Sequence, residues 1–413
     1  MDIFSIGTLW RIAIRDLGRN QRRSILTFIA VAIGLALCVV LSGLMTGSID
    51  GALQNSIRLQ TGHVQVRAES YDEDIVTLEW DDLLDDPQAR ANNILSIPGV
   101  KSAAPRLWAS GIIAKRDESI NVRVFGIDPL AESSDAYKEA IIEGHFIDPE
   151  DREGVLIGQR LAKSMGLVVG DQINLMVNTS DEQPDEAIFT IRGLFNTNVP
   201  AYDDATVFLP LSKAQAITRV GDRASAIVIF LDNRKDADMV ANVLYAPEYE
   251  ILTWNELNQV LLGAVETSAG MLALMYMIVL AVVAVVVVNT LLMAVFERTR
   301  EMGILASLGM KGRQILMMFL FEASVLGLVG MFFGIVLGSL GVLYLANVGW
   351  NMEELAATAA TAEIGYGSTI YAKFDFHDIL SLSLVSLGIT LLGSLYPAWL
   401  AARLEPVEAL RGL

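Results

Sequence analysis

The chain has very little of what most catalytic and disulfide-bonded proteins need. Its 413 residues include one cysteine, Cys38, and three histidines, His63, His145 and His377, which fall in separate segments. The sequence has no HExxH, CxxC or GxSxG motif, and the glycines of GMKGRQ are not followed by the Lys-Ser or Lys-Thr of a phosphate-binding loop. We therefore predict no disulfide framework, and a non-catalytic chain without a metal or cofactor of its own.

Charged residues are also scarce, at 19% of the chain, whereas hydrophobic residues make up 53%. Four windows contain no charged residue at all: 24–49, 267–296, 323–352 and 379–402. Each can cross a hydrocarbon core, which needs about 20 helical residues. We predict four transmembrane helices, at residues 24–49, 267–296, 314–345 and 379–402. The second window exceeds the core thickness, so it either protrudes as a stalk or tilts.

The net charge of −18 resides in a single segment. Residues 50–266 hold 36 Asp and Glu against 18 Lys and Arg, and the rest of the chain balances at 12 against 12. The basic residues of the rest lie on one side of the predicted membrane, apart from Lys373. The positive-inside rule then places both termini, with the tail 403–413, in the cytoplasm, and residues 50–266 and 346–378 outside. We predict no nucleic-acid partner.

Residues 50–266 are predicted to form a large α+β domain between the first and second spans. Strand, helix and strand patterns recur at 63–127 and again at 224–254, and the middle part is richer in glycine and short strands. We expect a split α/β lobe, at about 50–127 and 212–266, with a β-rich insertion at about 128–211. The acidic run 71–86 lacks EF-hand spacing, so we interpret it as a solvated loop rather than a Ca²⁺ site.

Residues 1–23 place arginines along one face of a helix. Four of them follow a spacing of i, i+4, i+8 and i+11, and a fifth lies next to the last: Arg11, Arg15, Arg19, Arg22 and Arg23. This pattern predicts an amphipathic helix in the cytoplasmic interface, bound to membrane lipids. Ordinary positive flanking of a span is the alternative.

The charged segment FERTREMGILASLGMKGRQI lies between two hydrophobic windows. We predict a cytoplasmic helix at 297–313 with an apolar face against the membrane, Met302, Leu305 and Leu308, and a polar face, Glu297, Arg298, Arg300 and Glu301. Gly309 to Gly312, with Lys311 between them, ends the helix. A helix that only rests at the interface, without a partner, is the alternative.

The third span carries glycines spaced by three and four on one helix face: Gly327, Gly330, Gly334, Gly338 and Gly341. Small residues allow two helices to approach closely, so this face is either a general packing seam or an interface that slides and transmits motion. Glu322 lies at the cytoplasmic edge of the same span. Snorkelling to the headgroups and a role in proton transfer are both open for it.

Three stretches together resemble a known family over nearly the full length of the chain. They are ERTREMGILASLGMKGRQI followed by FEASVLGLVGMFFGIVLG, the tail YPAWLAARLEPVEALRGL, and VLIGQRLAKSMGLVVGDQINL. The chain resembles the FtsX-like permeases of ABC transporters, of the MacB and LolC/LolE type. The stretch GLMTGSIDGALQNSIRLQTGHVQV is more similar to the LolC/LolE branch.

The resemblance implies a permease in a bacterial inner membrane, paired with a second copy or a homologous permease and driven by a cytoplasmic ABC ATPase dimer that binds ATP and Mg. Because only 23 residues precede the first span, we expect that ATPase to be a separate chain. In this family the helices transmit movement to the outer domain, here predicted to act on a lipoprotein, peptide or hydrophobic substrate, with a periplasmic protein or lipoprotein as a further partner. The alternative is an FtsX-like regulator that activates an extracytoplasmic cell-wall hydrolase without transport.

Overall fold

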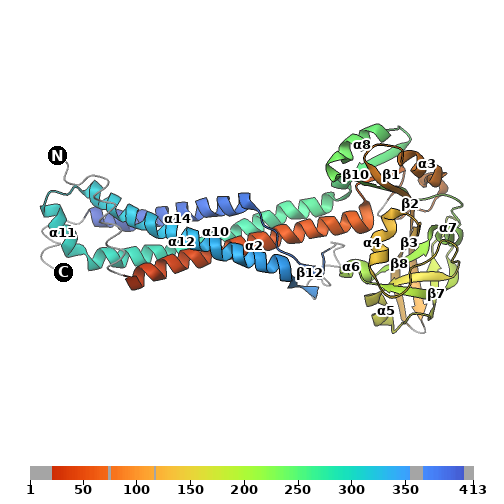
Figure 1. Cartoon of the computed structure of the whole chain (residues 1–413), viewed down its shortest axis with the longest axis horizontal. Coiled ribbons are helices and arrows are strands. Elements are labelled where there is room, and N and C mark those ends of the chain that lie inside the picture. Colours follow the sequence, from red (N-terminus) through yellow and green to blue (C-terminus); the bar gives the residue numbers. More distant parts are fainter. Residues whose placement is uncertain (1–20, 73–75, 116–117, 354–365, 404–413) are drawn as a thin grey trace. The chain divides into compact units, whose positions relative to one another are not determined.

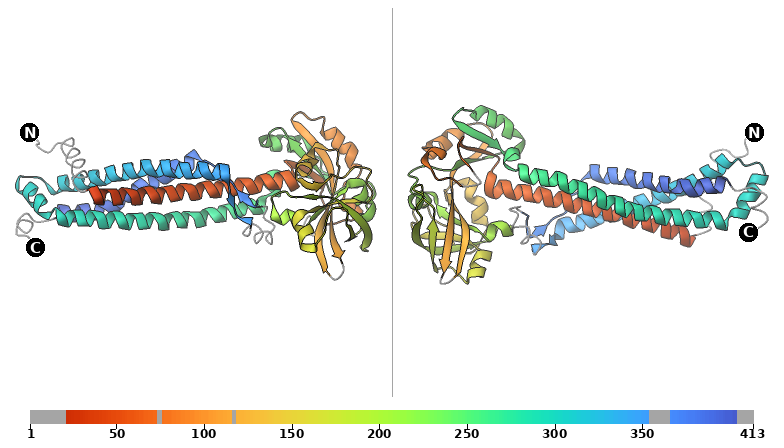
Figure 2. Two further views of the ribbon diagram at one scale, coloured as in Figure 1. Left: turned by 60° about the horizontal axis from the view of Figure 1, so that its bottom comes forward. Right: turned by 180° about the vertical axis from the view of Figure 1, so that it is seen from behind.

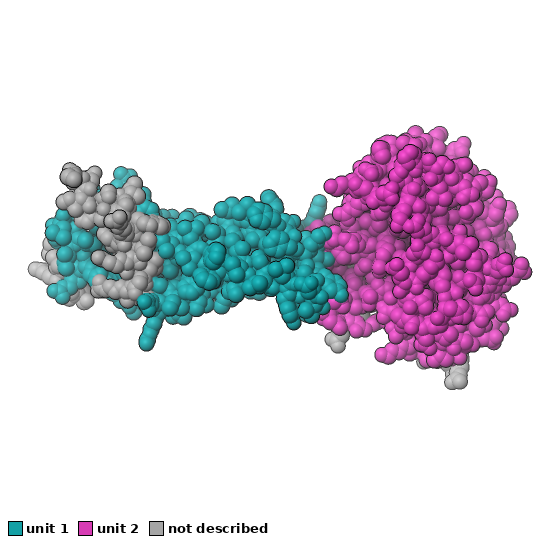
Figure 3. Space-filling model, in the orientation of Figure 1, with its two compact units in different colours: residues 1–47, 266–350, 371–413 teal, residues 48–265, 351–370 magenta. Residues whose placement is uncertain are grey.

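The computed structural model describes residues 21–72, 76–115, 118–353 and 366–403. The chain divides into two compact units, coloured separately in Figure 3. The helical unit comprises residues 1–47, 266–350 and 371–413, and the globular unit comprises residues 48–265 and 351–370.

The helical unit is built from long apolar helices that run side by side (Figures 1 and 2). They are α2 (Gln21–Ser56), α10 (Gln259–Glu297), α12 (Gly312–Val348) and α14 (Phe376–Ala402). Within the described residues, four helices are long and apolar enough to cross a membrane, and they correspond to the four predicted windows. Together with the α/β domain between the first and second of them, they confirm the predicted fold class. The 39 residues of α10 would extend about 58 Å at about 1.5 Å per residue. A helix of this length can either protrude from the membrane or tilt within it, so the protruding stalk stays a prediction.

One end of the globular unit is a small antiparallel sheet covered by two helices (Figure 1). Its strands follow the order β10 (Tyr249–Thr253), β1 (Val64–Ala68), β9 (Ala226–Leu231) and the first half of β2 (Val100–Lys115). Alternate residues such as Val64, Val66 and Ile229 form a core with the inner faces of α3 (Pro87–Ile94) and α8 (Ala237–Leu244). This end has the α/β character that the strand and helix patterns predicted.

The second half of β2 enters a sheet that closes on itself. Its order is β2, β3 (Glu118–Ile127), β8 (Thr206–Pro210), β5 (Gly154–Gly158), β7 (Asp185–Phe195) and β6 (Gln172–Val177), and β6 pairs again with β2. β4 (Ile141–Gly144) pairs antiparallel with the end of β7, at Gly193 to Phe195. Closure leaves these strands fewer open edges and encloses a large apolar core that includes Phe189, Phe195 and Phe208.

Shorter helices cover this closed sheet and connect its strands. They are α4 (Asp135–Glu139), α5 (Gln159–Met165), α6 (Pro200–Asp203) and α7 (Leu211–Thr218). The remaining short elements are η1 (Ile57–Thr61), η2 (Trp80–Asp82), η3 (Glu132–Ser134), η4 (Arg234–Asp236), α9 (Trp254–Leu257), β11 (Trp350–Asn351) and β12 (Thr369–Ile370).

The boundary between the two parts of the globular unit differs from the expected one. We placed it at about 127/128 and 211/212, but β3 and α7 belong to the β-rich part. The change occurs inside β2, where Arg106 pairs with Ala226 of β9 and Leu107 pairs with Gly126 of β3. One 16-residue strand serves both sheets, and Pro105 and Arg106 lie where it changes partner.

Asp203 of α6 is a buried carboxylate in the β-rich part, with 1% of its surface exposed. It accepts hydrogen bonds from the N and Oγ1 atoms of Thr197 at 2.9 and 2.8 Å. Burial is the largest effect on its pKa and raises it from 3.8 to about 6, against the lowering effect of the Thr197 hydrogen bonds. Because folding favours the protonated form, the contribution of Asp203 to stability falls as the pH rises through this interval.

We therefore expect Asp203→Asn to gain thermal stability relative to the wild type as the pH rises from about 4 to about 7, by at most about 3 kcal/mol. The amide cannot ionise, so it avoids the cost of a buried charge at neutral pH. Melting temperatures of the full chain at both pH values measure the difference. Asp222→Asn, at an exposed carboxylate, is the control. If the difference in melting temperature between Asp203→Asn and the wild type is the same at both pH values, Asp203 titrates as it does in the unfolded chain.

Candidate functional site

The predicted charged segment contains a short helix, α11 (Thr299–Ser307), between α10 and α12. Gly309 follows it with a φ of +96°, a conformation that glycine adopts without strain. The N–H groups of Gly309 and Met310 donate to the carbonyls of Ala306 and Leu305 at 3.0 and 3.1 Å. This is a Schellman C-cap, in which the residue after the glycine turns back onto the helix. Gly309 therefore fixes where α11 ends and how the chain enters α12.

The inner face of α11 is held against the ends of the neighbouring helices. Met302 and Met310 are 2% and 4% exposed and pack with Ile315 and Phe319 of α12 and Ala398 of α14. Burying each methionine contributes about 1.5–3 kcal/mol relative to exposing it to water. Leu305 is partly buried against the same cluster. These contacts make α11 a firm attachment between the ends of α10, α12 and α14.

A buried ion pair lies where α10 passes into α11. The guanidinium of Arg298 lies 3.5 Å from the carboxylate of Glu322 in α12, and their side chains are 7% and 1% exposed. We expected Arg298 on the outward polar face, and the structure corrects this. Arg298 lies four residues before Met302, whose N–H donates to the carbonyl of Arg298 at 3.0 Å, and this spacing brings both side chains to the same, buried side of the helix. Glu322 has a cationic partner inside the protein, rather than a path to the headgroups.

The outer face of α11 carries a stripe at a spacing of four residues, Arg300, Ile304 and Leu308. Ile304 is 47% and Leu308 is 71% exposed, and Arg300 is also exposed. We refer to these three residues as the outer stripe. Leu308 was expected to anchor the helix, but six residues after Met302 it is rotated by about 120° from that side chain. Met310 takes the anchoring position instead, a role that the Leu-Gly-Met sequence at a C-cap would have indicated.

The other predicted residues of this segment lie as follows: Glu297 and Lys311 are exposed, and Glu301 is half-buried. Of the predicted interfacial arginines, Arg11, Arg15 and Arg19 lie outside the described residues, as does most of the tail 403–413. Arg22 is exposed in the first turn of α2, and Arg23 belongs to the same turn. The roles of these residues remain predictions.

The glycine face of α12 contacts two helices rather than one. Gly330, Gly334 and Gly338 face the side chains of Val31, Leu35 and Val39, which follow one another at a spacing of four on α2. A Cβ atom added at any of the three glycines would lie 2.7 to 2.9 Å from the Cβ of its valine or leucine neighbour. The two helices therefore approach more closely than any larger residue would permit.

The ends of the glycine face differ from its centre. Gly341 faces Val40 of α2, whereas Gly327 faces Leu387 and Thr390 of α14. The glycines lie on one face as expected, but its first glycine contacts α14 and the other four contact α2. Whether this interface slides remains a prediction.

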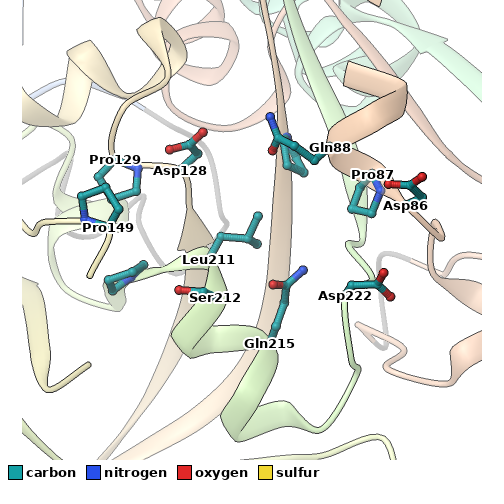
Figure 4. A pocket seen from close by; sticks show the side chains of 12 residues that line it. Asp86, Pro87, Gln88, Asp128, Pro129, Pro149, Leu211, Ser212, Gln215 and Asp222 are labelled. Atoms are coloured by element: carbon teal, nitrogen blue, oxygen red, sulfur yellow. The ribbon is translucent and has the colours of Figure 1, made fainter. Parts of the chain in front are cut away.

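A pocket of about 290 Å³ lies in the globular unit, between the start of α3 and the start of α7 (Figure 4). Prolines form much of its wall, and Asp86, Asp128 and Asp222 contribute carboxylates. Asp86 and Asp222 are exposed. In the part of the chain that the structure describes, no three His, Cys, Asp or Glu side chains are grouped to hold a metal ion. The pocket offers no arrangement of groups typical of catalysis.

Two family models match this chain. Residues 24–244 match the MacB-like periplasmic core domain, which covers more than half of the chain, and residues 273–406 match the FtsX-like permease C-terminal region. The first match ends at the last residue of α8, and the second includes α11, α12 and α14. The outer stripe and the Arg298–Glu322 pair thus lie in the second region.

Relatives match over nearly the whole chain. The lipoprotein-releasing system transmembrane protein LolC of Neisseria meningitidis is 24% identical over 97% of this chain and 98% of its own length. The macrolide export ATP-binding/permease protein MacB of Bdellovibrio bacteriovorus is 25% identical over 96% of this chain, but over 60% of its own length. Among solved structures, the periplasmic region of MacB from Actinobacillus actinomycetemcomitans is 14% identical, over 50% of this chain and 96% of that one, with a TM-score of 0.35.

Proposed function

This chain belongs to the family with a MacB-like periplasmic core domain and an FtsX-like permease C-terminal region; from that premise we propose that it couples ATP hydrolysis in a cytoplasmic ATPase to movement of the globular unit. It is an ABC transporter permease, and permeases of this family are generally not catalytic. In this proposal the ATPase binds ATP and Mg, and this chain carries the motion. A second copy or a homologous permease completes the assembly.

The observation that carries the proposal is the two-sided character of α11. Its inner side is packed onto α12 and α14 through Met302 and Met310. A force applied to α11 is therefore transmitted directly to those helices. Its outer stripe leaves two large apolar side chains and one cation exposed on one face. Apolar side chains with an adjacent arginine are typical of the centre of protein interfaces. The outer stripe therefore suits docking of a soluble partner.

The substrate class that we propose is a lipoprotein. Relatives named as lipoprotein-releasing proteins match this chain almost end to end, whereas the macrolide exporters are matched over a smaller share of their length. A lipoprotein would be passed from the outer leaflet of the inner membrane to a periplasmic partner, and the globular unit would act on it there. Peptides and hydrophobic small molecules are the competing substrates.

The outer stripe is tested by the triple variant Arg300→Ala, Ile304→Ser, Leu308→Ser. We expect its affinity for the ATPase to fall by at least about tenfold, because exposed interface anchors are lost while the buried face is kept. Co-purification and ATPase stimulation in lipid vesicles measure the loss. Val243→Ser, at an exposed valine of α8 in the globular unit, is the matched control and should bind as the wild type.

Two outcomes would contradict the proposal. If the triple variant retains wild-type affinity and ATPase stimulation, α11 is not the docking helix and only rests at the membrane interface. If vesicles that contain the wild-type chain and its ATPase release no triacylated lipoprotein with ATP, the substrate assignment is wrong. Activation of a cell-wall hydrolase under the same conditions would favour the regulatory alternative.

A further inference from the structure

The end of α2 packs into the globular unit, where Leu53 and, in the following turn, Leu59 are buried. From residue 48 onward α2 belongs to that unit, and it finishes in the π-helical turn η1, Ile57–Thr61. The last carbonyl groups of a helix have no partners within the helix and must find them elsewhere. Here Gln65, itself 2% exposed, donates through Nε2 to the carbonyl of Thr61 at 2.9 Å. The carbonyls before it are bound by three side chains from more distant parts of the chain.

Three donors converge on the carbonyl oxygen of Leu59. The hydroxyl groups of Tyr137 and Tyr202 donate to it at 2.5 and 2.9 Å, and Nη1 of Arg106 lies at 3.3 Å. Nη1 of Arg106 also donates to the carbonyl of Gln60 at 3.2 Å. The hydroxyl of Tyr202 is deeply buried, and burial followed by the neighbouring Tyr137 raises its pKa well above the ordinary value. Tyr202 therefore stays protonated and able to donate.

Arg106 is an unusual residue to find at such a place. It is 2% exposed, and among the described residues no carboxylate lies within ion-pair distance of it. Its Nη2 is buried without a hydrogen-bond partner. A buried cation is costly unless it meets negative charge, and the C-terminal end of a helix supplies a partial negative charge. The end of α2 is thus the electrostatic counterpart of Arg106, with the ring of Tyr137 5.4 Å from its guanidinium.

The three side chains come from both parts of the globular unit. Arg106 is the residue at which β2 changes partner, from β9 in the small sheet to β3 in the closed sheet. Tyr137 belongs to α4 and Tyr202 to α6, and both pack in the core of the closed sheet. The start of α10 is tied to the same place, because Ser56 at the end of α2 donates to Asn258 at 2.5 Å. The end of α2 is therefore held to both sheets at once.

We propose that Arg106, Tyr137 and Tyr202 form a rigid joint that makes the last turn of α2 and the globular unit move as one body. They are positioning residues, which act on the substrate only through the movement of the domain. The role of the joint in transport rests on the proposed function, but its rigidity does not. If the joint is loosened, α2 moves and the domain follows incompletely, so ATP is hydrolysed without proportionate release.

The test is the double variant Tyr137→Phe, Tyr202→Phe, which removes both hydroxyls and keeps both rings. In vesicles that contain the full chain and its ATPase, we expect the amount of triacylated lipoprotein released per ATP to fall by about fivefold or more, the lower end of typical coupling effects, while ATP hydrolysis continues. Arg106→Gln should show the same loss, with partial rescue by Arg106→Lys. Tyr245→Phe, at a tyrosine that is 76% exposed, should leave release per ATP unchanged.

A second measurement addresses rigidity directly. Spin labels at Gln54→Cys on α2 and Glu139→Cys on α4, both exposed positions of the globular unit, are placed in a Cys38→Ala background. We expect one narrow distance distribution in the wild-type joint, the same with and without ATP, and a broadened distribution in the double tyrosine variant. If that variant fails to accumulate, Tyr202→Phe alone is measured in the same way.

The two measurements separate the possible failures. A narrow distribution that the tyrosine variants leave unchanged would overturn the joint, whatever the substrate. A broadened distribution with unchanged release per ATP would overturn the role of the joint in transport. If the wild type releases no lipoprotein at all, the proposed function fails, and the distance distributions still decide whether the joint is rigid.

Discussion

Replacing Gly334 by leucine is expected to separate α12 from α2 and to abolish the lipoprotein release that we propose for this chain. A Cβ at this position would lie 2.9 Å from the Cβ of Leu35 and 3.0 Å from the main-chain carbonyl of Ala32. A main-chain atom cannot move aside as the end of a side chain can, so the helices must part along their length. We expect a loss of about 3 kcal/mol, the upper end of overpacking penalties. The melting temperature of the detergent-solubilised chain and ATP-dependent release measure it.

The matched control is Gly388→Leu in α14. A Cβ added there would meet no described atom within 4 Å, so the same substitution should leave the melting temperature close to that of the wild type. Gly334→Ala should give an intermediate loss, because it adds one methyl group in the same direction. A melting temperature for Gly334→Leu equal to that of Gly388→Leu would mean that α2 and α12 do not pack closely through the glycine face.

The second large effect is expected from Glu322→Ala. This change leaves the buried cation of Arg298 without its carboxylate, which typically costs about 3–5 kcal/mol. Because Arg298 lies at the bend between α10 and α11, we also expect α11 to lose its fixed orientation and the ATPase to be stimulated less. Thermal unfolding and ATPase stimulation in vesicles are the two measurements.

The double variant Arg298→Met, Glu322→Met distinguishes the cost of an unpaired buried charge from the effect of changing the side chains at these two positions. Replacing a whole buried ion pair by apolar side chains is often neutral or stabilising, so we expect most of the lost stability to return. Arg313→Met, at an exposed arginine near the start of α12, is the control and should shift stability by no more than about 0.5 kcal/mol. If Glu322→Ala were as stable as Arg313→Met, the Arg298–Glu322 pair would not contribute to the stability of the fold.

The candidate site shows where reasoning from residue spacing succeeds and where it stops. The helix in the charged segment, its end at Gly309 and the buried position of Met302 are local consequences of sequence, and the structure agrees with each. The assignments of Arg298 to the polar face and of Leu308 to the anchoring face were wrong. Arg298 lies four positions before Met302 and shares its side of the helix, whereas Leu308 lies six positions after Met302 and is rotated by about 120° from it. Arg298 was grouped with its polar neighbours by charge, whereas its position on the helix relative to Met302 determined its burial.

The sequence by itself determined the membrane spans, the acidic domain between the first two of them, and the family. Each of these depends on runs of apolar residues, on charge and on short motifs. Such features are local, so they can be recognised without knowing how distant parts of the chain pack. Only the tertiary structure decided that β2 serves two sheets, that β6 returns to close one of them, and that Arg106 meets the end of α2. These features pair residues tens of positions apart, and one strand pattern is compatible with many partners. Long-range packing selects among those partners, so it also determined how the end of α2 is fixed to the domain.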